Sequence, residues 1–145
     1  MSIQILHLVS GETLIADISF ISPTEIQMDL PLLIHQHFDE EVSFSVSQWL
    51  TLSIPTEKVT ISKDKIITTT PVKRHYYESY SLASFEIISM YLTNNAKYMC
   101  DEFPDTHKEI NQKLIEQLSE LKENFSNKYN LDIPENEITS DTIIH

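Results

Sequence analysis

The sequence predicts a mostly β fold with an α-helical extension. Up to residue 71, apolar and polar residues alternate with a period of two, which is typical of strands with one buried face. Beyond Pro71 the apolar residues recur at intervals of three or four, which is typical of helices. We therefore divide the 145 residues into a strand-rich part, 1–71, and a helical part with an acidic tail, 72–145.

The first two strands are predicted at 3–9 and 13–20, on either side of Gly11, the only glycine of the chain. Residues 3–9 are apolar on both faces, as in a strand that is covered on each side. A lone glycine inside such a run indicates either a sharp turn or the close approach of another backbone.

A third strand is predicted at 26–34, after a turn at 22–25. Pro31 interrupts this strand. Because proline lacks a backbone N–H, we expect Pro31 at a bulge, a bend or an edge of the sheet.

The clearest alternation covers residues 42–54, after a charged turn at 39–41. Its even-numbered residues are apolar and its odd-numbered residues are serine or threonine, except at Gln48 and Trp49. We interpret this segment as one long strand that is bent in the middle.

Residues 59–61 and 66–70 are predicted to form a last short strand pair or one broken strand. Residues 74–93 then follow as a helix, whose end is expected to fray at Asn94 and Asn95. Tyrosine is common at interfaces, and it also packs helices on sheets. One of these two roles is expected for Tyr76, Tyr77, Tyr80 and Tyr91.

A second, amphipathic helix of about 20 residues is predicted from Thr106 onward. The segment Thr106-His-Lys-Glu109 has the form of a capping box. Its apolar stripe consists of Ile110, Leu114, Leu118, Leu121 and Phe125. Such a stripe needs a partner surface, which can be the sheet of the same chain, a neighbouring subunit or another protein.

The chain carries 22 acidic and 10 basic residues, which gives a net charge of −12. A field of that sign keeps a protein in solution and repels nucleic acid. Five of the ten basic residues nevertheless lie within 58–74: Lys58, Lys63, Lys65, Lys73 and Arg74. No apolar run is long enough to span a bilayer, and the single cysteine, Cys100, suits a reducing compartment. We expect a soluble, cytoplasmic protein with no membrane partner.

Two short motifs resemble those of Sm-like proteins. Residues 9–18, Val-Ser-Gly-Glu-Thr-Leu-Ile-Ala-Asp-Ile, have the spacing of the first Sm motif, with Ala16 in place of its second glycine. Residues 61–66, Ile-Ser-Lys-Asp-Lys-Ile, have the spacing of the second motif. Among Sm-like proteins, the chain is most similar to the small ones attributed to marine T4-like phages. The resemblance covers about residues 1–80. It implies a strongly bent, five-stranded antiparallel barrel, followed here by two C-terminal helices.

The resemblance also implies a homo-oligomeric ring, in which the fourth strand of one subunit pairs with the fifth strand of the next. The segment 42–54 has no lysine to protect an unpaired edge, and head-to-tail pairing closes into a ring when the rotation allows. The alternative is that the helix at 74–93 covers this edge. The predicted interface residues are Phe44, Val46, Leu50, Leu52, Val59, Ile61 and Ile66.

RNA binding is the activity that the resemblance implies. The family holds a uracil or an adenine with an asparagine from the first loop and a basic residue from the second motif. Here the first-loop positions carry Ser22 and Glu25, and Ser62-Lys63 replaces the Arg-Gly pair of the second motif. The candidates for phosphate contacts around a pore are Lys58, Lys63 and Lys65. The alternative is that these lysines are ordinary solvated charges.

The sequence offers little for metal binding or catalysis. His35 and His37 share one face of a strand, and a third metal ligand would have to come from Asp39, Glu41 or His7. We interpret the two histidines as exposed and the acidic run as a solvated turn, and we predict no metal and no cofactor. Because phosphate-binding glycine loops, nucleophile elbows and paired cysteines are all missing from the sequence, we predict that the protein is not an enzyme.

Two functions remain as hypotheses. The first is a ring-forming oligomer that acts as a non-enzymatic scaffold or adaptor, encoded by a phage and partnered by a host or phage protein. The second is an RNA-binding ring that uses the basic segment 58–74. The acidic charge and the replaced base-binding residues favour the first hypothesis.

Overall fold

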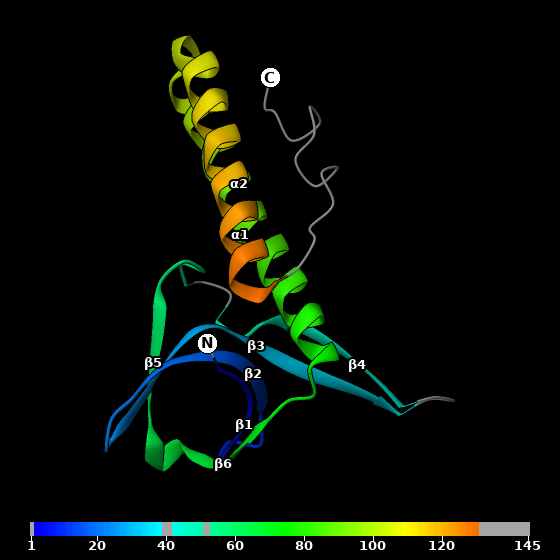
Figure 1. Ribbon diagram of the computed structural model, residues 1–145. Helices are drawn as coiled ribbons and strands as arrows, with labels where there is room; N and C mark the ends of the chain where they lie inside the picture. Colours follow the sequence, from blue (N-terminus) through cyan, green and yellow to red (C-terminus); the bar gives the residue numbers. More distant parts are fainter. Residues whose placement is uncertain (1, 39–41, 51–52, 131–145) are drawn as a thin grey trace. The chain divides into compact units, whose positions relative to one another are not determined.

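The computed structural model describes residues 2–38, 42–50 and 53–130 (Figure 1). They form an antiparallel β-sheet followed by two α-helices, so the prediction of a mostly β fold with an α-helical extension is confirmed. The chain divides into two compact units, Met1–Tyr80 and Ser81–His145. The first unit therefore extends beyond the sheet into the beginning of the first helix.

One antiparallel sheet contains six strands: β1 (Ile3–Leu8), β2 (Thr13–Ile21), β3 (Glu25–Phe38), β4 (Val42–Gln48), β5 (Lys58–Ser62) and β6 (Ile66–Pro71). The strand order is β4-β3-β2-β1-β6, and β5 also pairs with β3. Because β2 occupies one edge of β3, β4 and β5 share its other edge, β5 along residues 25–29 and β4 along residues 32–38. The strands curve around a common interior (Figure 1).

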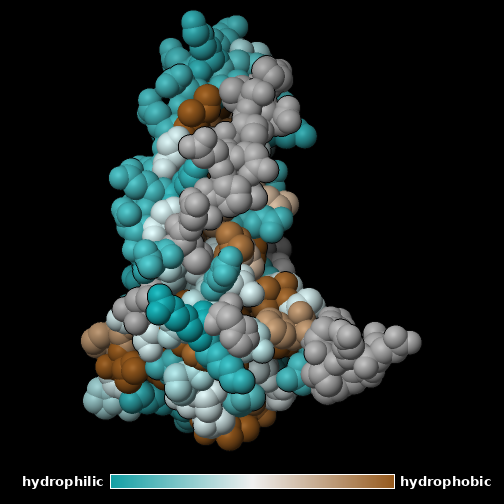
Figure 2. Space-filling model, turned by 45° about the vertical axis from the view of Figure 1, so that its right-hand side comes forward, coloured by the Kyte–Doolittle hydropathy of each residue, from teal (hydrophilic) through white to brown (hydrophobic). Residues whose placement is uncertain are grey.

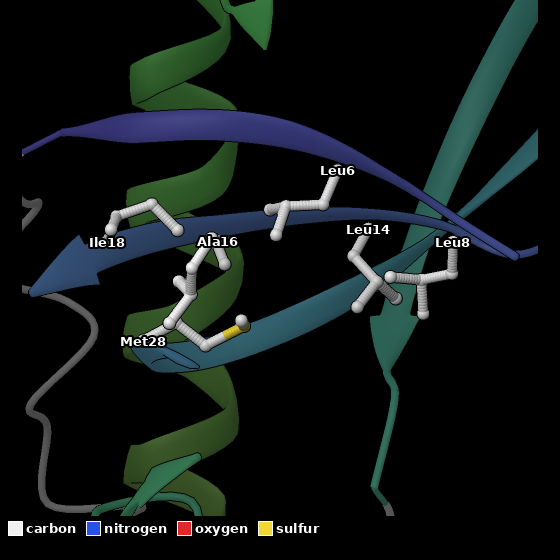
Figure 3. Packing of buried hydrophobic residues seen from close by; sticks show 7 residues of the cluster. Leu6, Leu8, Leu14, Ala16, Ile18 and Met28 are labelled. Atoms are coloured by element: carbon white, nitrogen blue, oxygen red, sulfur yellow. The ribbon is translucent and has the colours of Figure 1, made fainter. Parts of the chain in front are cut away.

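The core of the sheet lies on the face of the even-numbered residues of β1, β2 and the first half of β3. Figure 3 shows their side chains gathered between these strands. The fully or nearly fully buried members are Leu6, Leu8, Leu14, Ala16, Ile18, Ile26 and Met28. Burying one large apolar side chain stabilises the fold by roughly 1.5–3 kcal/mol, so the alternation in the sequence carries much of the driving force for folding.

Gly11 forms a sharp turn between β1 and β2. Its φ of 94° lies in the left-handed region, which glycine adopts at little cost. Its N–H donates a hydrogen bond to the carbonyl oxygen of Leu8 at 3.0 Å. A side chain at this position would meet open space, so the turn, rather than a close backbone approach, accounts for the glycine.

The prediction of one bent strand over 42–54 is wrong, because β4 ends at Gln48. The Trp49 ring packs against the core, and its Nε1–H donates to Oε2 of Glu12 at 2.8 Å. Both the backbone N–H and the hydroxyl of Ser53 donate to the carbonyl oxygen of Leu50, which turns the chain. The contacts of the Trp49 indole therefore end the pairing of β4 with β3 at residues 48 and 49, where the alternation of apolar and polar residues also breaks.

The predicted pairing of the last two strands is also wrong. A short 3₁₀ turn, Lys63–Lys65, separates β5 from β6, and β5 pairs with β3 whereas β6 pairs with β1. Six strands therefore replace the five that we predicted.

The helical part consists of α1 (His75–Glu102) and α2 (His107–Tyr129), joined by a 3₁₀ turn at Pro104–Thr106. The two helices lie side by side (Figure 1), and Phe85 of α1 contacts Phe125 of α2 edge to face. α1 does not fray at Asn94, because Ala96 and Cys100 continue its buried side. The helix thus runs nine residues beyond the predicted end at residue 93.

The ends of α2 also differ from the prediction. The Thr106 hydroxyl donates to the carbonyl oxygen of Phe103 at 2.9 Å and makes no cap to the helix, so the predicted capping box is wrong. Asn130 ends the helix in the left-handed conformation, with a φ of 53°, as is common at helix C-termini. The predicted acidic tail beyond it lies outside the described residues.

Candidate oligomer interface and basic segment

Three strands of the sheet each leave one edge without a neighbour among the described strands. β4 and β5 each pair only with β3, and β6 pairs only with β1. Every residue of β6 after Ile66 is exposed, and the side chain of Ile67 is 69% exposed. The exposed positions of β6 carry no charge. Unprotected edges of this kind are templates for pairing with another strand.

The predicted interface residues of β5 and β6 face the core instead of solvent. Val59, Ile61 and Ile66 are half-buried and pack against the cluster formed by β1, β2 and β3. Their packing fixes the two strands on the sheet. The backbone edges and the outward side chains, above all Ile67, are therefore the surfaces open to a partner.

Among the described interface residues predicted on 42–54, Phe44 and Val46 lie on β4, whereas Leu50 lines a small hollow together with Val59 of β5. Phe44 is exposed on β4, and its ring meets the ring of Tyr76 edge to face, with centroids 5.1 Å apart. Val46 is half-buried, and Leu50 lies in the turn after β4. Leu52 lies outside the described residues.

Phe44 and Tyr76 line a hollow of about 320 Å³ that sequence reasoning missed. Ile5, Ile15 and Ile34 also line it, and they lie on the sheet face opposite the Leu6 and Leu14 side chains. The alternation of β1 and β2 shows two apolar faces at these positions. Only the three-dimensional pairing with β4, however, places an aromatic ring beside them.

The basic segment lies on and around the 3₁₀ turn. Lys58 forms an ion pair with Asp29, with Nζ and Oδ1 2.8 Å apart, so part of its charge is neutralised. The Lys63 N–H donates to the carbonyl oxygen of Thr24 at 2.8 Å, and the Lys65 carbonyl oxygen accepts from the Val9 N–H at 2.9 Å. The two lysines are thus held between the β1–β2 and β2–β3 connections.

Replacing Lys58 by methionine is expected to change the free energy of unfolding by less than about 1 kcal/mol, because both charges of the pair are partly exposed. Urea denaturation followed by the fluorescence of Trp49, the only tryptophan, measures this change at low and at high salt. A loss above about 2 kcal/mol would mean that the pair is a structural element of the β3–β5 junction.

Tyr80 connects the start of α1 to the sheet within the first unit. Its fully buried hydroxyl lies 2.8 Å from the carbonyl oxygen of Asp29 and 3.1 Å from that of Leu30, and it accepts from the Asp17 N–H at 3.3 Å. Leu30 has a φ of 30°, a strained conformation for a residue with a side chain. It precedes Pro31, where we predicted a bulge or a bend, and the β2–β3 register shifts next to it.

No set of three metal-ligating side chains comes together among the described residues. His35 Nε2 lies 2.8 Å from the Ser47 hydroxyl on the exposed surface. His7 Nδ1 lies 3.3 Å from the Thr13 hydroxyl. The His37 side chain and the candidate ligands Asp39 and Glu41 lie outside the described residues.

No protein-family model and no curated protein matches the chain. Within the described residues, neither helix combines the length and the apolar composition needed to cross a membrane. The function is therefore inferred from the sheet edges and the charges described above.

Proposed function

We propose that this chain is an Sm-like, ring-forming homo-oligomer that acts as a non-enzymatic scaffold or adaptor. In the ring, β5 of one protomer pairs with β6 of the next. The observation that carries the proposal is that two of the three open edges, those of β5 and β6, belong to short strands of similar length within a single curved sheet. A head-to-tail contact between two different edges generates a closed ring when the rotation between protomers permits it.

The two edges are compatible in length and charge. β5 has five residues and β6 has six, so each can form a ladder along its full length. The only charged residue of β5, Lys58, already has Asp29 as its partner. Pairing therefore buries no uncompensated charge, and each new backbone hydrogen bond contributes about 0.5–1.5 kcal/mol.

RNA binding is the second candidate, because Lys63 and Lys65 are held on a turn that a ring repeats in every protomer. Three features favour the scaffold instead. The net charge is −12, and the ion pair with Asp29 engages Lys58. In addition, the Ser22 hydroxyl caps its own turn by accepting from the Glu25 N–H at 2.9 Å. We propose a host or phage protein as the partner and the cytoplasm as the location.

Short oligo(U) and oligo(A) are expected to show no salt-sensitive binding to the full chain. Fluorescence anisotropy at low and at physiological salt measures this, with the Lys63→Glu and Lys97→Glu variants in parallel. Lys97 lies on α1, outside the basic segment. Affinity that falls steeply with salt, and that Lys63→Glu abolishes while Lys97→Glu preserves it, would contradict the scaffold and establish the RNA-binding ring.

A further inference from the structure

The helical hairpin has an apolar groove that its own two helices do not fill. The groove has a volume of about 480 Å³ and is lined by residues of both helices and of the connection between them, among them Leu92, Ala96, Met99, Phe103 and Ile110. Met99 and Phe103 are 42% and 53% exposed. Large apolar side chains grouped in this way indicate a docking surface, and methionine adapts well to a packed partner.

The hairpin by itself buries few residues at this end. Ala96, Leu114 and Leu118 form its buried cluster, with Leu92 and Ile110 packed beside them. Figure 2 shows apolar patches, in brown, on the otherwise hydrophilic surface of the hairpin. Two hairpins commonly bury such surfaces together as a four-helix bundle.

The charges at the groove are complementary to those of a second copy. Glu109 and Lys113 line it one helical turn apart on α2, and neither has an ion-pair partner among the described residues. If two α2 helices cross antiparallel beside Asn111, Glu109 of each copy faces Lys113 of the other. α2 carries four lysines and four glutamates, whereas the whole chain has a net charge of −12, so the net charge does not repel a second copy along this helix.

We propose that the hairpins of two copies pair about a two-fold axis through this groove. The contact uses α1 and α2 and is independent of the sheet edges. In the proposed ring it joins protomers in pairs, so the assembly contains an even number of protomers.

Native mass spectrometry of the full chain tests the pairing. Met99→Glu places a charge in the groove, and Glu109→Lys sets lysine against lysine between the copies. Each is expected to halve the number of protomers in the assembly, through a rise of about 10-fold or more in the dissociation constant of the contact. The double swap Glu109→Lys with Lys113→Glu is expected to restore the wild-type mass.

The control is Glu123→Lys, a charge reversal on α2 outside the groove, which is expected to leave the mass unchanged. Unchanged masses in both Met99→Glu and Glu109→Lys would overturn the proposal, and so would a monomeric wild type. In either of these cases, amide exchange of the tail 131–145 identifies what occupies the groove. Faster exchange in Met99→Glu than in the wild type identifies the tail, and equal exchange indicates another protein. If the sheet-edge ring does not form but the hairpins do pair, the wild type is a dimer, and Met99→Glu and Glu109→Lys each convert it to a monomer.

Discussion

Replacing Ile67 by lysine is expected to dissociate the sheet-edge assembly while the protomer stays folded. The side chain is exposed on β6, so a lysine there costs the fold little. In the ring, the same lysine would stand at the β5–β6 contact between two protomers. Natural proteins use lysines in this way to block edge pairing. We expect a loss of about 2 kcal/mol or more per contact, or roughly a 30-fold weaker association.

Sedimentation velocity at micromolar concentration measures this effect. The expected species is no larger than the dimer that the helical hairpins form. Phe20→Lys is the matched control, because Phe20 is 60% exposed on β2, outside the two strands of the proposed contact. An Ile67→Lys protein with the wild-type sedimentation coefficient would show that β6 is not an interface.

Tyr80 is expected to be the most sensitive single residue for the stability of the first unit. Tyr80→Ala removes a fully buried ring and should cost about 3–5 kcal/mol of unfolding free energy. Tyr80→Phe removes the hydroxyl alone, which leaves the carbonyls of Asp29 and Leu30 without that donor. We expect a cost of about 1–3 kcal/mol, the penalty of an unsatisfied buried polar group.

Urea denaturation followed by Trp49 fluorescence measures both changes in the first unit. Tyr98→Phe is the control, since Tyr98 is 63% exposed on α1, and its effect should stay below about 0.5 kcal/mol. If Tyr80→Phe were as stable as the wild type, the strained conformation at Leu30 would have to be held by the surrounding packing instead of the hydroxyl.

The sequence was sufficient to predict the parts of the fold that depend on local pattern. The alternation of β1 and β2 identifies the core face, because successive side chains on a strand point to opposite sides. Gly11 predicts the turn between them because the turn needs a positive φ, which glycine adopts without strain and other residues do not. The change of period after Pro71 locates the start of the helical part.

The parts that failed depend on contacts between distant residues. The alternation over 42–54 looks like a single strand, and the hydrogen bond from Trp49 to Glu12, 37 positions away, ends it early. The separate pairing of β5 and β6 depends on their different neighbours, β3 and β1. The length of α1 depends on packing against α2, which overrides the weak helix propensity of Asn94.

The sequence directed attention to the strands that have open edges, but not to the side chains that are exposed on them. It pointed to the segment 42–54, which contains β4, and to β5 and the beginning of β6, and each of these strands has one open edge among the described strands. It selected Val59, Ile61 and Ile66 because they are apolar, whereas these side chains pack against the core and Ile67 points outward. The Lys58–Asp29 pair joins residues 29 positions apart, and no local pattern indicates it.

Amide hydrogen exchange of β5 and β6 tests most directly whether these edges join copies of the chain. Peptides covering 58–62 and 66–71 are to be compared between the wild type and Ile67→Lys, with β2 as the internal reference. We predict wild-type protection close to that of β2, and exchange about 100-fold faster in the variant for the amides that face away from β3 and β1. Equal exchange rates in the two proteins would contradict the pairing of β5 with β6.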